Sequence, residues 1–308
     1  MDPFRHLSFL GEPVLPDPRA ASSVCREFPG LSFAAALAPE SSAFYEALCA
    51  EWGLSADRYR NSSLARRQAA CLRALRVATP TDGARVIAAD PVASERALGV
   101  VMIGVTEFFR DGSVFEALAG LLVAMRGMAS RPLRALSLGC SNGSELYSLA
   151  MLMAEREVLQ GAHLIGLDCR PAAIECASAG IYPVEAARSV PAELRARYLS
   201  RAPAFEAVRG RRPRQARVRI SEELRSACRW HVADAFSAWP AAAECPLDLI
   251  MCRNLAIYLT PRASDDLWAR CLRRLAPGGL LVVGKAERLP SGASAALARV
   301  GPCIYRKR

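Results

Sequence analysis

The sequence lacks the short motifs that most often mark nucleotide and metal sites. It contains neither a GxGxxG dinucleotide fingerprint nor a GxxxxGK[ST] phosphate loop. It has 11 cysteines but no CxxC pair, and only three histidines, which are widely spaced. These spacings do not suit a zinc site, and we expect that the chain binds no metal.

Long apolar runs are also missing. No uninterrupted run could span a bilayer, and the proline-broken N-terminus has no signal-peptide core. We therefore expect a cytoplasmic protein with no membrane insertion, whose odd number of cysteines are reduced thiols. With 52% hydrophobic and 23% charged residues, the chain has the composition of a folded protein. We expect it to act as a monomer.

Lysine is scarce, and the charge comes almost wholly from arginine. The formal net charge is +10, yet Lys285 and Lys307 are the only lysines. A basic chain can bind nucleic acid, an anionic membrane or an acidic protein surface, and charge alone does not choose among them. The one dense cluster of arginines lies at 209–219.

Composition and periodicity divide the chain into three parts. Residues 1–30 are rich in proline and serine and predict a loose arm. Residues 31–111 have helical patterns and predict a small helical domain with its linker. From residue 112 to residue 308 strand-like segments alternate with helical ones, which is typical of a separate α/β domain.

One predicted helix of the N-terminal part carries a basic face. In SLARRQAACLRALR, Arg66 and Arg73 lie opposite the apolar stripe. Taken alone, such a face is ordinarily solvated surface. Pro80 and Asp82-Gly83 are expected to break the helical pattern before it resumes.

The pattern from residue 112 to residue 308 predicts an α/β fold with a doubly wound, mostly parallel, Rossmann-like sheet. The strand-like segments that lead to this prediction are Arg134–Cys140, His163–Asp168 and Leu247–Cys252. An insertion at about 182–228 is longer than an ordinary connection. Its alternating run Arg217–Ile220 predicts a small β subdomain.

The turn after the first strand, GCSNGSE, faces the edge where such sheets bind cofactors. Gly139 and Gly143 permit close backbone approach, and Glu145 opens the following helix. An acid there competes with a phosphate for the positive helix end, but it suits a ligand with an amine or a positive centre. Asp168 ends the next strand, where an acid commonly holds ribose hydroxyls. Together these residues favour a site for S-adenosylmethionine.

Five sequence blocks occur in one order that is similar to the CheR-type methyltransferases of bacterial chemotaxis. The blocks are GVTEFFRD, GCSNGSELYSLAM, LDCRPAAIECASAGIY, ELRARYL and LDLIMCRNLAIYLTPRASDDLWARCLRRLAPGGLLVVGKAERL. The resemblance runs from about Ser63 to Tyr305. It implies an S-adenosylmethionine-dependent enzyme that methylates glutamate side chains on acidic helical segments of receptor-like signalling proteins.

The resemblance also implies roles for single residues. Eight are implied to bind the cofactor, namely Thr106, Arg110, Glu145, Asp168, Asp234, Ala235, Arg253 and Asn254. Arg253, Asn254 and Tyr258 are implied to position the reacting groups, and Arg66 and Arg73 to contact the receptor. A carboxylate acceptor is already ionised near neutral pH, so no general base is expected.

Several positions depart from the family pattern. The family usually has Asn where this chain has Gly104, and its CSTGEEPYS motif reads CSNGSELYS here. Arg170 and Lys285 replace an acid and a histidine near the site. Two alternatives therefore stay open: a nucleic-acid methyltransferase, favoured by the basic charge, and a cofactor-binding regulatory module with weak turnover. We see no RNA-binding module, and nucleic acid is not our expected partner.

Overall fold

The computed structural model describes residues 36–102, 104, 106–202 and 216–308. The predicted arm at 1–30 and most of the arginine cluster at 209–219 lie outside these residues. Four helices form the N-terminal part together with a short 3₁₀ helix: α1 (Pro39–Glu51), η2 (Ala56–Arg58), α2 (Asn61–Leu75), α3 (Pro80–Ala89) and α4 (Pro91–Val101).

The expected break at Pro80 and Asp82-Gly83 is wrong, because α3 runs through these residues. Thr79 caps the helix by accepting a hydrogen bond from the Asp82 amide, and Pro80 takes the first turn, where a missing N–H costs nothing. Gly83 allows α1 to pack closely, since a Cβ there would stand 2.8 Å from the ring of Phe44. The same residue types thus begin a helix and tighten a helix contact.

A seven-stranded sheet forms the C-terminal part, as predicted. Its strands are β1 (Arg134–Leu138), β2 (His163–Asp168), β6 (Cys228–Val232), β7 (Leu247–Cys252), β8 (Leu275–Val283), β9 (Leu297–Gly301) and β10 (Ile304–Lys307). The order is β6-β2-β1-β7-β8-β10-β9. The five strands from β6 to β8 are parallel, and β10 runs antiparallel to both of its neighbours.

Helices cover both faces of this sheet. They are α5 (Gly112–Met128), α6 (Ser144–Glu155), α7 (Pro171–Ala179), α10 (Ala241–Glu244), α11 (Pro261–Arg274) and α12 (Ala293–Ala296), with η5 (Ala256–Tyr258) before α11. Because side chains alternate along a strand, Leu136 and Leu138 join the cluster that holds Trp268 of α11, while Ala135 joins the one that holds Leu149 of α6.

The insertion folds as a separate small sheet, which confirms the predicted β subdomain. Its strands are β3 (Ile181–Pro183), β4 (Leu199–Arg201) and β5 (Arg217–Ile220), and its helices are η3 (Val184–Ala187), α8 (Ala192–Tyr198) and α9 (Glu222–Ala227). The order is β3-β5-β4, and both pairings are antiparallel.

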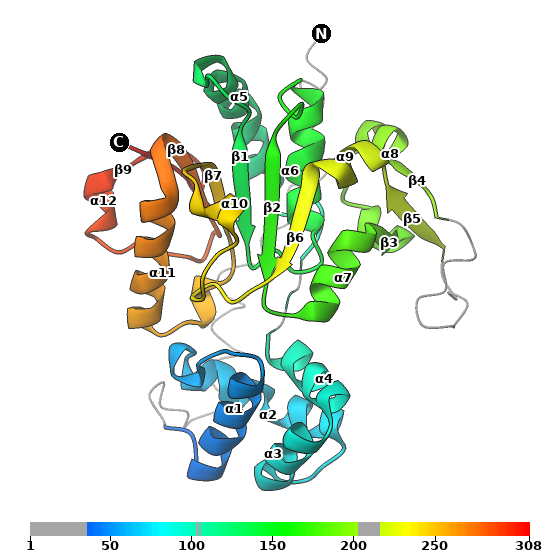
Figure 1. The fold of residues 1–308 in the computed structure, drawn as a ribbon, viewed down its shortest axis with the longest axis vertical. Coiled ribbons are helices and arrows are strands. Elements are labelled where there is room, and N and C mark those ends of the chain that lie inside the picture. Colours follow the sequence, from blue (N-terminus) through cyan, green and yellow to red (C-terminus); the bar gives the residue numbers. More distant parts are fainter. Residues whose placement is uncertain (1–35, 103, 105, 203–215) are drawn as a thin grey trace, which may run out of the picture.

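The N-terminal helices lie beyond the end of the sheet toward which the parallel strands point (Figure 1). One hydrophobic cluster runs from Phe44 of α1 to Leu138 and Trp268, so these helices share a core with one face of the sheet. Backbone bonds join the parts too, because the amides of Arg60 and Thr260 donate across the junction. The N-terminal helices therefore cover the carboxyl edge of the sheet.

Candidate functional site

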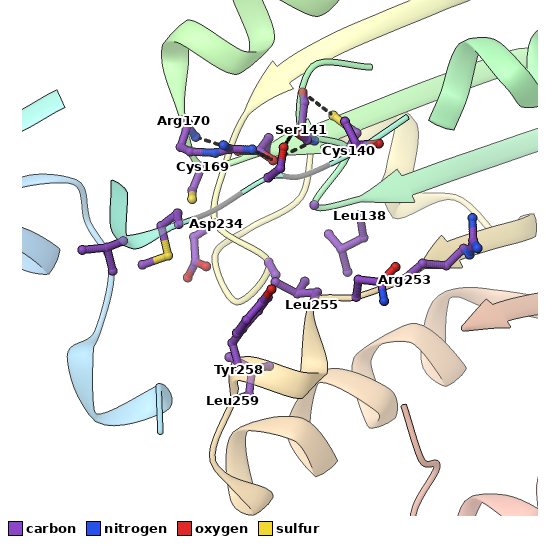
Figure 2. Close-up of a pocket in the computed structure, with 18 of the residues that line it drawn as sticks. Leu138, Cys140, Ser141, Cys169, Arg170, Asp234, Arg253, Leu255, Tyr258 and Leu259 are labelled. Carbon is purple, nitrogen blue, oxygen red and sulfur yellow. Dashed lines mark hydrogen bonds and ion pairs between the residues drawn. The ribbon is translucent and has the colours of Figure 1, made fainter. Parts of the chain in front are cut away.

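A pocket lies between the carboxyl edge of the sheet and helix α2 (Figure 2). It brings together every residue predicted to bind the cofactor or to position the reacting groups: Thr106, Arg110, Glu145, Asp168, Asp234, Ala235, Arg253, Asn254 and Tyr258. Strand register explains this convergence. Leu138 of β1 pairs with Leu167 of β2 on one side and with Cys252 of β7 on the other, so the residues that follow each strand leave the sheet side by side.

Glu145 lies at the floor of the pocket, in the first turn of α6. The turn before it depends on Gly143, which has φ of 85° and leaves no room for a Cβ against Trp230. The Ser137 hydroxyl donates to one carboxylate oxygen at 2.9 Å, and Arg253 donates to the other at 3.1 Å. Glu145 is therefore held in place and partly neutralised.

Asp168 ends β2 and is 6% exposed. The Ser141 amide donates to Oδ2 at 2.8 Å, and the Arg170 amide donates to Oδ1 at 3.0 Å. The Arg170 guanidinium adds two further bonds, from Nε to Oδ1 at 2.9 Å and from Nη2 to Oδ2 at 3.1 Å. The predicted ribose ligand is thus clamped by an arginine of its own loop.

Asp234 lies in the loop after β6, beside Ala235. It comes close to Asp168 because β6 pairs with β2 and the Ala233 amide donates to the Asp168 carbonyl at 3.0 Å. Burial raises the pKa of the Asp234 carboxyl, although the Arg58 guanidinium at 3.3 Å opposes this effect. Arg58 also stacks over the Phe236 ring, so the N-terminal part closes this end of the pocket.

Arg253 does not project toward Tyr258. Its guanidinium is 1% exposed and pairs with Asp111 at 2.6 Å and Glu145 at 3.1 Å. It also donates to the Arg110 carbonyl at 3.0 Å. Figure 2 shows this side chain running away from Tyr258. The geometry makes Arg253 an anchor that ties the loop after β7 to α6 and to the start of α5.

Asn254 adopts a left-handed backbone with φ of 61°. Glu287 stabilises this loop, because its Oε1 accepts the Leu255 and Ala256 amides at 2.8 Å each. A Cβ at Gly284 would stand 2.9 Å from the side-chain Nδ2 of Asn254 and 3.0 Å from its backbone nitrogen, so the two segments approach closely. Burial raises the pKa of Glu287, and its backbone hydrogen bonds oppose that rise.

Tyr258 faces the pocket from η5, next to the N-terminal helices. The Arg67 guanidinium lies over its ring, 5.1 Å from the centroid. The two residues predicted to contact a receptor, Arg66 and Arg73, are exposed on α2 and are not among the residues that line the pocket. Helix α2 therefore presents one arginine to the site and two others to the surface.

Residues 104–301 match a family model described as CheR methyltransferase, SAM binding domain. The chain belongs to this family. It is 30% identical over 248 residues to chemotaxis protein methyltransferase 2 of Pseudomonas aeruginosa, covering 79% of this chain and 82% of that one. The chemotaxis protein methyltransferase of Listeria innocua is 24% identical over 257 residues, covering 83% of this chain and 92% of that one.

A third relative is named for a different process. The probable biofilm formation methyltransferase WspC of Pseudomonas putida is 33% identical over 192 residues, covering 61% of this chain and 42% of its own length. Membership of the family confirms the predicted fold, the methyltransferase activity and S-adenosylmethionine as the cofactor.

The residues of the pocket fit this cofactor. Three carboxylates, those of Glu145, Asp168 and Asp234, line one cavity together with apolar side chains such as Leu138 and Leu255. Such a lining suits a ligand that joins a cationic amino-acid end to a ribose and an apolar base. Among the residues described, no cluster of three acids, cysteines or histidines could hold a metal. No helix among them could cross a membrane.

Sequence reasoning gave no role to Arg58, Arg67 or Asp111 and missed the bonds of Glu287. Glu287 had a visible signal, because it is the last residue of the block that resembles the family's GHSE. Arg67 adjoins the predicted Arg66, but its neighbour Tyr258 lies far along the chain. Asp111 and Arg58 act through partners more than 100 residues away, which no local pattern can reveal.

Proposed function

We propose that the chain transfers the methyl group of S-adenosylmethionine to glutamate carboxylates of receptor-like signalling proteins. The observation that carries this proposal is the state of the acids in the pocket. Glu145, Asp168 and Asp234 are each paired with an arginine. None of the described residues that line the pocket is a histidine or a lysine. The pocket is built to orient an acceptor and offers no general base.

A carboxylate acceptor has no need of such a base. The ordinary pKa of a glutamate is about 4.3, so its side chain is ionised near neutral pH. The cofactor supplies a methyl group activated by an adjacent sulfonium. The residues of the chain then have to align the two reactants and exclude water, which accounts for most of the rate in such a transfer.

Asn254, Tyr258 and Arg67 form the side of the pocket that would receive the acceptor. Asn254 and Tyr258 belong to one short loop, and Arg67 reaches it from α2. We assign Arg67 the steering of the incoming carboxylate, because a guanidinium attracts a carboxylate and its stacking on Tyr258 fixes its position. Asn254 and Tyr258 then orient the acceptor oxygens.

The surface of α2 offers further contacts to the receptor segment that carries the glutamate. Arg66 and Arg73 are exposed on the helix that also supplies Arg67. An acidic helical segment would be drawn to this face by charge before one of its glutamates enters the pocket. The names of the relatives point to receptors of chemotaxis or of biofilm formation. We also assign the enzyme to the cytoplasm, a reducing compartment in which free thiols persist, and the ten cysteines among the described residues are free thiols.

The nature of the product tests the proposal. A lysate of the native cell is incubated with the protein and methyl-labelled cofactor, and the labelled material is treated with mild alkali. Methyl esters release volatile methanol, whereas methylated bases and amines do not. Labelled methanol supports the proposal, and label that resists alkali would favour a nucleic-acid methyltransferase. Cofactor binding without transfer would favour the regulatory module.

A single variant ties the transfer to the pocket. Asn254→Ala should lower the single-turnover rate of ester formation about a hundredfold, because one aligning contact is lost. The affinity for S-adenosylhomocysteine, the demethylated product, should change much less. Ser264→Ala, in the first turn of α11 and outside the pocket lining, is the matched control and should keep the wild-type rate.

A further inference from the structure

The hydrogen-bonding capacity of Asp168 is fully used inside the protein. A carboxylate has about four lone-pair positions. In Asp168 these accept the Ser141 amide, the Arg170 amide and two donors of the Arg170 guanidinium. The two backbone donors are fixed by the loop. Ribose hydroxyls can therefore reach this carboxylate by exchange with the guanidinium and with no other group.

Gly104 provides the space in which the Arg170 guanidinium lies. A Cβ at this position would stand 2.3 Å from Nη2 and 2.8 Å from Nη1 of Arg170. It would also stand 2.3 Å from the Ser141 hydroxyl, whose donor bond to the Gly104 carbonyl is 3.1 Å. Any larger residue at 104 would exclude the guanidinium from its position on Asp168. Gly104 and Arg170 thus form a matched pair.

We propose that Arg170 competes with the cofactor ribose for Asp168 and thereby sets the affinity for the cofactor and its product. This inference rests on the proposed role of Asp168 as the ribose ligand. Binding requires the guanidinium to leave the carboxylate, so only the molecules in which it has left are ready to bind. The apparent affinity is the intrinsic affinity multiplied by the fraction of molecules that are ready to bind.

The environment of Arg170 favours the paired state. Its side chain is 14% exposed, and that of Asp168 is 6% exposed. Burial acts to lower the pKa of the Arg170 guanidinium, but the hydrogen bonds and charge of Asp168 outweigh it and the pKa is raised. The pair is therefore a charged one in a shielded position, and releasing it is costly. The same competition would speed the release of S-adenosylhomocysteine, the demethylated product.

Calorimetry with S-adenosylhomocysteine tests this competition, because this ligand binds without turnover and carries no net charge. Arg170→Met removes the guanidinium, and Gly104→Ala displaces it while keeping the arginine. If the ready state is about a tenth of the wild-type molecules, each variant should bind the ligand about tenfold tighter. The double variant should also gain about tenfold, because both changes release the same pair.

Three controls isolate the effect. Ser141→Ala removes the hydroxyl that Gly104→Ala also crowds, and it should not reproduce the tenfold gain, because it leaves the Arg170 guanidinium on Asp168. Arg85→Met removes an arginine whose side chain is 74% exposed and should have no effect on affinity. Asp168→Ala should weaken binding about a hundredfold if this residue holds the ribose.

Each outcome decides a separate point. Weaker binding by Arg170→Met would overturn the competition and make Arg170 a cofactor contact. A hundredfold gain in the double variant would show two independent effects and also overturn it. Unchanged binding by Asp168→Ala would remove the ribose assignment on which the inference rests, while leaving the methyltransferase proposal intact. A wild type that binds no S-adenosylhomocysteine would overturn the proposed function itself.

Discussion

Replacing Arg253 by methionine should destabilise the protein more than it disturbs the acceptor side of the pocket. Arg253 follows the buried strand β7 and is the partner of two acids that come from other elements. Methionine fills a similar length without charge or donors. Among the residues that the structure describes, the change would leave Glu145 with only the Ser137 hydroxyl, and it would leave the Arg110 carbonyl without the Arg253 donor.

The size of the loss follows from burial. The guanidinium is 1% exposed, while Asp111 and Glu145 are 17% and 13% exposed. Removing one partner of a buried ion pair typically costs 3–5 kcal/mol, because the remaining charge stays buried and uncompensated. Asp111 keeps a second bond from Lys285 at 2.7 Å, although that lysine is 63% exposed and the bond is weak. We therefore expect a loss near the lower end, about 3 kcal/mol.

Urea unfolding of the purified variant measures this free energy directly. The matched control is Arg131→Met, which breaks an ion pair of 2.7 Å with Asp248 at a side chain that is 35% exposed. Solvent screens that pair, so the control should lose no more than about 1 kcal/mol. A loss below about 1 kcal/mol for Arg253→Met, together with an abolished transfer rate, would refute the anchor role. Arg253 would then act on the acceptor, as the family resemblance implies.

Two further results are expected. The double variant Arg66→Glu, Arg73→Glu should methylate an acidic receptor segment more slowly but bind the cofactor as before, and high salt should have the same effect on the wild type. The control reverses the charge of two exposed arginines on α11. A normal methylation rate in the α2 variant would show that this face of α2 does not contact the receptor. Because burial raises the pKa of Glu287, the folded state takes up its proton more readily than the unfolded state. The unfolding free energy of the wild type minus that of Glu287→Gln should therefore increase as the pH falls from 7 through the raised pKa, and it should become constant below about 4.3. A difference that does not depend on pH would show that the pKa of Glu287 is not raised.

The strands were the most predictable elements of the fold. The structure confirms His163–Asp168, Leu247–Cys252 and Arg217–Ile220 at the predicted residues. The first two are short apolar runs bounded by polar residues, and the third alternates, so each pattern follows from the faces that the strand buries. Local sequence is sufficient to predict a strand where its buried residues follow a simple repeat.

The break predicted at Pro80 shows where such reasoning ends. Proline and Asp-Gly are signals of interruption, and they cannot say by themselves whether a helix stops or starts. The answer depends on Thr79, whose hydroxyl caps the helix, and on the ring of Phe44, which packs against Gly83. The second of these contacts joins residues almost forty positions apart, which a local window does not include.

The site was predicted as a set of positions, and the structure adds the directions of the side chains. Topology alone brings Asp168, Asp234 and Asn254 to one edge, because parallel strands end together there. It does not say that Arg170 turns back onto Asp168 or that Arg253 turns toward α6. Those directions depend on which carboxylates lie within reach after folding, and each is a choice among several partners of similar charge.

Arg253 and Asn254 illustrate the consequence for mechanism. The two residues are adjacent in the sequence and share a family motif, but the chain turns sharply between them because Asn254 has a left-handed backbone. That turn sends the guanidinium into the protein toward Asp111 and Glu145, and the pairing it makes there fixes the position from which Asn254 begins. Substituting either residue should lower the transfer rate, so activity alone cannot separate them. Stability can, because only Arg253 leaves two partly buried acids behind when it is removed. The variant without Arg253 should lose about 3 kcal/mol of unfolding free energy, whereas Asn254→Ala should lose only about 1 kcal/mol, the cost of placing alanine in a left-handed backbone.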